Sequence, residues 1–100
     1  MADRLTDAQI AEGLAKLPGW RHEGEAIVHD FQFVDFVAAL GFIAQVGALA
    51  ERANHHPELT NVYNRVRIAL STHDAGGITD LDLKLADAIS ARAPWNAPKA

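Results

Sequence analysis

Three of the five histidines in this 100-residue chain lie within one stretch, residues 51–82. His55 and His56 are adjacent and precede Pro57, whereas His73 follows a strand-like run. Histidine gives and takes protons readily near neutral pH, because its ordinary pKa is about 6.5. Adjacent residues point in different directions in a helix or a strand, so we expect His55 and His56 to have different roles. This stretch is the first candidate for a site of chemistry.

The residue types leave three interpretations of this cluster open. A zinc site needs three or four converging ligands, and the chain has no cysteine to supply a thiolate. The spacing of His55, His56 and His73 is also unusual for a metal site, so we predict that no metal is bound. The histidines could instead be surface residues without a chemical role. The third interpretation is metal-free general acid–base catalysis on a bound polar heterocycle.

Length and composition narrow the class of protein. The length predicts one domain over residues 1–100, and 49% hydrophobic residues are enough to form a core. We find no apolar run long enough to span a bilayer and no leader pattern, so we expect no membrane association. The net charge of −4 argues against direct nucleic-acid binding. The lack of cysteine suits a cytoplasmic protein.

Capping signals and periodicity predict the elements of the N-terminal half. Thr6 and Gln9 form a capping-box pair that begins a helix, which ends before Gly19. Residues 20–33 alternate as a β-hairpin, and Ile27, Phe31 and Phe33 share one face with a histidine. The hairpin carries the two remaining histidines, both of which we expect to face solvent: His22 and His29.

A long helix is predicted from Asp35 to about Ala53, and Asn54 is suited to end it in the left-handed conformation. Its apolar surface is wide and rich in small residues, which favours close packing on a sheet or on another subunit. One predicted apolar stripe consists of Phe36, Leu40, Ile43, Gly47 and Ala50. A neighbouring stripe consists of Phe42, Val46 and Leu49.

The C-terminal half predicts a second hairpin and a last helix. The hairpin covers residues 60–72, and we expect His73 to continue the polar face of its second strand. Thr79 and Asp82 form a second capping pair, which begins a helix that ends near Ala91. The order α-β-β-α-β-β-α predicts a two-layer α+β fold with a four-stranded antiparallel sheet and helices on one face. The order of the strands in the sheet stays open.

Several motifs in the stretch match a known family. They are Glu51, His55-His56-Pro57-Glu58, Asn61-Val62-Tyr63-Asn64, Ser71-Thr72-His73, Gly77 and Asp82. In these residues the chain resembles the pterin-4a-carbinolamine dehydratase family, and the similarity extends from about Leu5 to Ile89. One departure is Leu59, where family members often carry an aromatic residue that forms one wall of the pocket.

The resemblance implies a hydro-lyase that converts 4a-hydroxytetrahydropterin to quinonoid dihydropterin and water, in tetrahydropterin recycling. It needs no cofactor and no metal, and its substrate is the product that aromatic amino acid hydroxylases leave. By this analogy His55 and His73 handle protons, and His56 mainly holds the substrate. The residues expected to support the site are Glu51, Pro57, Ser71, Thr72 and Asp82. For Asp82 the capping role explains the residue equally well.

The resemblance also implies an alternative function, because animal relatives bind a homeodomain transcription factor through a helical surface. The wide apolar surface of residues 35–53 suits packing against another helix. Self-association covers such a surface without a second kind of protein. We therefore expect a homodimer or a homotetramer, and the sequence does not distinguish between them.

Overall fold

A computed structural model describes residues 2–93 of the chain. The elements are α1 (Asp7–Leu14), β1 (Arg21–Glu23), β2 (Ala26–Gln32), α2 (Phe36–Ala53), β3 (Glu58–Val62), β4 (Arg65–Leu70), the 3₁₀ turn η1 (His73–Ala75) and α3 (Asp80–Ser90). The predicted α-β-β-α-β-β-α order is confirmed, with η1 added before α3. That residues 1–100 form one domain stays a prediction, since residues 1 and 94–100 lie outside the described part.

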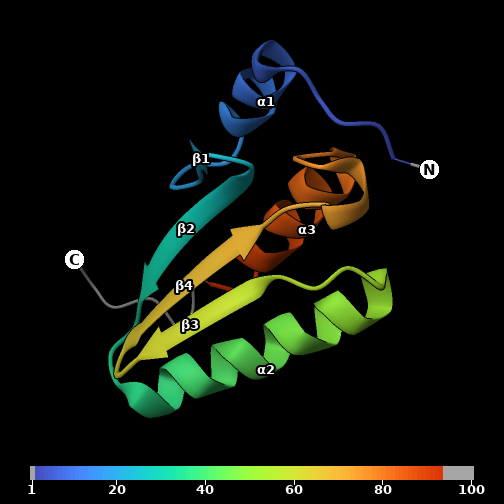
Figure 1. Cartoon of the computed structure of the whole chain (residues 1–100). Coiled ribbons are helices and arrows are strands. Elements are labelled where there is room, and N and C mark those ends of the chain that lie inside the picture. The colour runs from blue at the N-terminus through green and yellow to red at the C-terminus, as the bar shows by residue number, and fades with distance from the viewer. Residues whose placement is uncertain (1, 94–100) are drawn as a thin grey trace.

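The four strands form one antiparallel sheet in the order β1-β2-β4-β3 (Figure 1). The central pair joins the two hairpins: Ile27 is opposite Leu70, and Phe31 is opposite Val66. The return of the chain through α2 places β4 between β2 and β3. The end of β4 and the start of β2 therefore lie together, beside the segment that carries His55 and His56.

The helices cover one face of this sheet. In β4, Val66, Ile68 and Leu70 are fully buried, whereas Arg65 and Arg67 on the opposite face are exposed. Each of the three helices contributes buried residues to the same core cluster, so the three helices pack on the same side (Figure 1). This two-layer arrangement follows from the alternation of β4, since only one side of the strand offers apolar surface.

The opposite face of the sheet, which no helix within residues 2–93 covers, carries a group of paired charges. Arg21 donates to Asp30 at 2.7 Å, and Arg67 donates to Glu23 at 2.7 Å. The Arg21 guanidinium is the main reason why the pKa values of Glu23 and Asp30 are lower than usual. Because these groups are exposed, their contribution to stability is small, and they keep this face polar.

Of the two predicted stripes, helix α2 mainly buries the one that contains Phe42 and Val46. Ala39, Phe42, Val46 and Ala50 are buried, while Phe36 and Leu40 stay 44% and 45% exposed. The two candidate stripes lie side by side on the helix, and the sheet accepts the one centred on Phe42 and Val46. A Cβ atom added at Gly41 or Gly47 would meet nothing within 4 Å. These two glycines therefore do not serve close packing within the described chain, whereas Ala39 lies in the core.

Helix α2 also corrects an expectation about membranes. Its 18 residues have a hydropathy of 1.4, which by length and composition is enough to cross a bilayer. The expectation that the chain holds no such run is therefore wrong. In this fold α2 lies along the sheet and packs against α3 and β4, as the core helix of a globular domain does (Figure 1).

The prediction for the hairpin histidines is half right. His22 is exposed, but His29 lies on the inner face and is partly buried. Its ring stacks on Phe31 with centroids 3.7 Å apart and meets the edge of Trp20 at 5.4 Å. Its Nδ1 is buried without a hydrogen-bond partner. The reason lies in the register, because His29 is opposite Ile68 of the core face.

Burial makes His29 a pH-sensitive element of the fold. Desolvation lowers its pKa below the ordinary value of 6.5. The unfolded chain therefore binds a proton more readily than the folded one, and stability should fall as the pH drops below about 6.5. In His29→Phe the decrease in thermal midpoint between pH 7 and pH 5 should be smaller. His22→Gln, at an exposed histidine, should keep the wild-type slope. Equal slopes in all three proteins would contradict this account.

Candidate active site

Helix α2 ends where the histidine pair begins. Asn54 adopts the left-handed conformation, with φ 51° and ψ 43°, as expected for a residue that ends a helix. The backbone N–H of His55 still donates to the carbonyl of Ala50 at 3.1 Å, so the last turn of the helix holds this residue. The peptide bond before Pro57 is trans, and β3 begins at Glu58, two residues earlier than predicted.

His55 points inward and pairs with a buried carboxylate. Its Nε2 lies 2.5 Å from Oδ1 of Asp82, and the side chains are 11% and 0% exposed. Oδ2 of Asp82 accepts hydrogen bonds from the backbone N–H of Thr79 at 2.9 Å and the hydroxyl of Thr72 at 2.8 Å. Asp82 thus caps α3, as the sequence predicts, and holds His55 at the same time.

His56 has a different environment, because it points away from the core. Its Nε2 is hydrogen-bonded to Oε1 of Glu51, which lies on the last turn of α2. The two side chains are 57% and 78% exposed. His56 also lines a cavity of about 200 Å³ with Glu58 and Ser71. His55 instead lines an apolar cleft of about 410 Å³ between α2 and α3. The adjacent histidines therefore face different surroundings.

His73 does not continue a strand, which corrects the prediction. Strand β4 ends at Leu70, and His73 begins η1 as an exposed residue. The backbone of Thr72 pairs with that of Gly77, with N to O distances of 2.8 and 3.4 Å, and closes a tight loop around η1. Gly76 allows this turn because its φ is 72°. Within residues 2–93, no hydrogen bond joins His73 to His55 or His56.

The two motifs nevertheless meet in space. His55 and Thr72 share the carboxylate of Asp82, and His56 and Ser71 line the same cavity. His55 and His56 therefore lie beside Ser71 and Thr72 in space, and His73 is the next residue in the sequence after Thr72. The sequence missed one member of this group: Thr79 was expected only to cap α3. Its hydroxyl is 2.7 Å from that of Thr72, and the spacing of the capping box was the only available signal.

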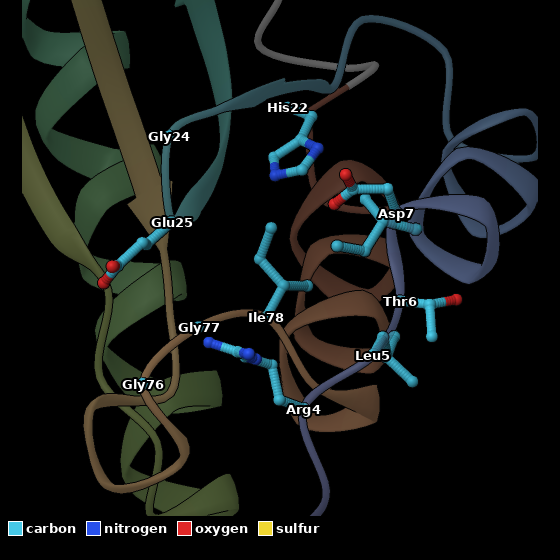
Figure 2. Close-up of a pocket in the computed structure, with 11 residues that line it drawn as sticks. Arg4, Leu5, Thr6, Asp7, His22, Gly24, Glu25, Gly76, Gly77 and Ile78 are labelled. Carbon is cyan, nitrogen blue, oxygen red and sulfur yellow. The ribbon is translucent and has the colours of Figure 1, made fainter.

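Another cavity lies on the other side of the η1 loop and is lined by none of the predicted site residues. It measures about 530 Å³ and opens between the N-terminal segment, the β1–β2 turn and residues 76–78 (Figure 2). Here the N-terminal segment holds the loop: Leu5 donates its N–H to the carbonyl of Ile78 at 2.8 Å. The stem of Arg4 packs so tightly on Gly77 that an added Cβ would lie 2.8 Å from its Cδ.

The described residues offer no ready metal centre. Among residues 2–93, no three His, Cys, Asp or Glu side chains lie close enough together to hold a metal ion. The two histidine–carboxylate pairs are separate, since each carboxylate holds its own ring. This arrangement of imidazoles and carboxylates can move protons, and metal-free chemistry stays a prediction.

Comparison with known proteins places this geometry in a family. The sequence profile described as pterin 4 alpha carbinolamine dehydratase matches residues 3–92. The chain belongs to this family. A relative from Chloroflexus aurantiacus is 52% identical over 86 residues, which cover 86% of this chain and 92% of the relative. One from Thermomicrobium roseum is 49% identical over 83 residues, or 83% and 89% of the two chains. Both bear a provisional pterin-4-alpha-carbinolamine dehydratase name.

Solved structures agree with the fold. A protein from Brucella melitensis described as a transcriptional coactivator/pterin dehydratase is 45% identical, with a TM-score of 0.88 over 91% of this chain and 99% of that one. A pterin dehydratase-like RuBisCO assembly factor of the alpha-carboxysome is 22% identical, with a TM-score of 0.66 over 75% and 89%. At that identity the second likeness shows the fold alone.

The difference in burial predicts that loss of the Asp82 carboxylate lowers the free energy of unfolding more than loss of the Glu51 carboxylate. Asp82→Ala removes the acceptor of three donors and should lower the free energy of unfolding by about 3 kcal/mol, since buried polar groups lose their partners. Glu51→Ala leaves the partner exposed to water and should not change stability measurably. Urea unfolding at one fixed protein concentration checks both. Equal effects of the two substitutions would contradict the difference in burial.

Proposed function

We propose that this protein removes water from a 4a-hydroxytetrahydropterin to give a quinonoid dihydropterin. The hydroxyl on C4a takes a proton and leaves as water when the C4a–O bond breaks. N5 gives up its proton, and a C4a=N5 double bond forms. The reaction exchanges no electrons with another molecule, so it needs only a proton donor, a proton acceptor and a site that orients the ring.

The observation that carries this proposal is the His55–Asp82 pair. A buried carboxylate beside an imidazole orients the ring and stabilises the imidazolium that forms when the ring takes a proton. In this proposal His55 accepts the proton of N5. His73, exposed on the neighbouring loop, supplies a proton to the leaving hydroxyl. Family membership supports the choice of a pterin as the substrate.

His56 serves binding in this proposal. Glu51 orients its ring from the last turn of α2. The cavity beside it also contains the Ser71 hydroxyl and the Glu58 carboxylate, which suit the hydrogen-bonding edge of a pterin ring. Pro57 keeps the segment between His56 and β3 extended. In this proposal the buried His55–Asp82 pair transfers protons, and the exposed His56–Glu51 pair binds the substrate.

The proposal also covers the setting of the reaction. A carbinolamine of this kind is the product that aromatic amino acid hydroxylases leave, so the protein would act after such an enzyme in tetrahydropterin recycling. The chemistry uses no redox cofactor, and we place it in the cytoplasm.

Replacement of each histidine separates these roles. His55→Ala and His73→Ala should each lower kcat by about 10²–10⁴-fold, the usual contribution of a general acid or base. His56→Ala should mainly raise KM, because it removes binding that is equal in the ground and transition states. The measurement is dehydration of freshly generated 4a-hydroxytetrahydropterin, with the rate of the uncatalysed reaction subtracted.

The controls for this assay address folding and metals. Thermal unfolding should confirm that each variant is folded. The assay is run with a metal chelator, in which wild-type activity should persist. Near-normal kcat in both His55→Ala and His73→Ala would refute the assignment, and so would activity that is lost on chelation and regained only with zinc.

A second proposal concerns self-association through α2. Val34 and Val37 are 73% and 74% exposed, and Phe36 and Leu40 extend this apolar surface. Gly41 and Gly47 leave room for another backbone to approach, since nothing in the described chain lies within 4 Å of their Cβ positions. A second copy would cover this surface in a homodimer or homotetramer. A helical segment of another protein is the alternative occupant.

Charge placed on this surface tests self-association. Leu40→Glu should shift the protein toward monomer, because a carboxylate would be buried at the contact between subunits. Ala8→Glu, at an exposed position on α1, should leave the oligomer intact. Light scattering at micromolar concentration measures both. A wild-type protein that is already monomeric under these conditions would refute the proposal.

A further inference from the structure

A chain of hydrogen bonds connects the N-terminal cap of α3 to the ring of His55. The backbone N–H of Leu81 donates to the hydroxyl of Thr79 at 3.2 Å, and this hydroxyl lies 2.7 Å from that of Thr72. The Thr72 hydroxyl lies 2.8 Å from Oδ2 of Asp82, and Oδ1 lies 2.5 Å from His55 Nε2. Thr79 and Asp82 are both 0% exposed, so water does not reach these two side chains.

The direction of these hydrogen bonds can be assigned by starting from the groups that can only donate. A backbone N–H can only donate, so Oδ2 of Asp82 must accept from Thr79 N at 2.9 Å. The Thr72 hydroxyl has one proton and gives it to the same oxygen. Thr79 must then donate its own hydroxyl proton to Thr72, because that oxygen is left as the acceptor. Every donor in the group therefore points toward the carboxylate.

We propose that the α3 cap, acting through Thr79, determines which nitrogen of His55 carries the proton. Two donors occupy Oδ2 of Asp82, so the remaining oxygen, Oδ1, is the one that accepts from His55. The ring must then be protonated on Nε2, and Nδ1 is left as the bare nitrogen. Thr79 is a positioning residue in this scheme, because it touches no substrate and acts through Asp82.

This tautomer matters because only the bare nitrogen can accept a proton. Within residues 2–93, His55 Nδ1 makes no hydrogen bond and is not among the buried unpartnered atoms, so it is open to solvent. A ring protonated on Nδ1 could not act as the base of the proposed reaction. The inference rests on the proposed function only for this effect on rate, and the position of the proton can be measured by itself.

The second histidine pair supplies the contrast. Glu51 is 78% exposed, and among the described contacts its carboxylate is held only by His56. No cap donor fixes which oxygen accepts, and water can replace either partner. The His56–Glu51 pair is therefore exposed to water, whereas the His55–Asp82 pair is buried and is held by the α3 cap.

The decisive substitution is Asp82→Asn, which keeps the shape of the carboxylate. The backbone N–H of Thr79 still requires an acceptor, so the amide oxygen must take the place of Oδ2. The amide nitrogen then faces His55 Nε2 and donates to it, which drives the proton to Nδ1. The wild-type ring should show Nε2–H in ¹⁵N-detected NMR at a pH where it is neutral, and Asp82→Asn should show Nδ1–H.

The change of tautomer at His55 should also lower kcat for the dehydration. In a Ser-His-Asp triad the same exchange lowers kcat about 10⁴-fold through the wrong tautomer, and here a loss of at least about 10²-fold is expected. Thr79→Val keeps the N–H but removes the hydroxyl, and it should lower kcat about 2–10-fold with KM unchanged. Thr79→Ser should restore the wild-type value. Glu51→Gln is the matched control and should leave the His55 tautomer unchanged.

The outcomes separate the two ideas. Nδ1–H in the wild-type protein would overturn the inference even if Asp82→Asn fails to fold, and Nε2–H in a folded Asp82→Asn would overturn it as well. If the tautomers are as expected but the wild-type protein does not dehydrate the carbinolamine, the proposed function is wrong and the role of the cap stands.

Discussion

The carboxylate of Asp82, the one fully buried acidic group among residues 2–93, is the group on which the proposed site depends. A charge without solvent is costly unless donors surround it, and here the α3 cap, Thr72 and His55 supply those donors. The same atoms therefore begin a helix, tie the end of β4 to that helix and orient an imidazole at the end of α2. Three segments distant in sequence meet at one side chain, so the local geometry of the site is inseparable from the packing of the fold.

Much of the fold follows from local sequence. Both capping boxes, the Asp35 cap and the left-handed Asn54 occur where the residue types predict them, because these signals act within one turn of the chain. The strand order and the buried stripe of α2 depend on contacts between distant segments, which periodicity does not contain. The partial burial of His29 has the same cause, since its partner Ile68 is set by the register of β2 with β4.

The site could be predicted in part. The motifs predicted that His55, His56, Asp82 and Thr72 belong to one site, and this stays a prediction. In the structure the Asp82 carboxylate joins His55 to Thr72, and the two adjacent histidines have different surroundings, as their adjacency predicts. The hydroxyl of Thr79 could not be assigned a role beyond the cap, because the Thr72 contact requires the β4 end and the α3 start to be packed together. The position of His73 was misjudged because β4 ends at Leu70 and the chain then turns through η1, which Gly76 ends in the left-handed conformation.

The attachment of the N-terminal segment has a practical consequence. Arg4 and Leu5 are tied to Gly77 and Ile78, directly behind the loop that carries His73. A purification tag joined a few residues before Arg4 is thus covalently linked to the N-terminal segment that holds this loop. A tag at this position could change how residues 4 and 5 hold the loop, and with it the kinetic constants. The tag should therefore be cleaved before the histidine variants are compared.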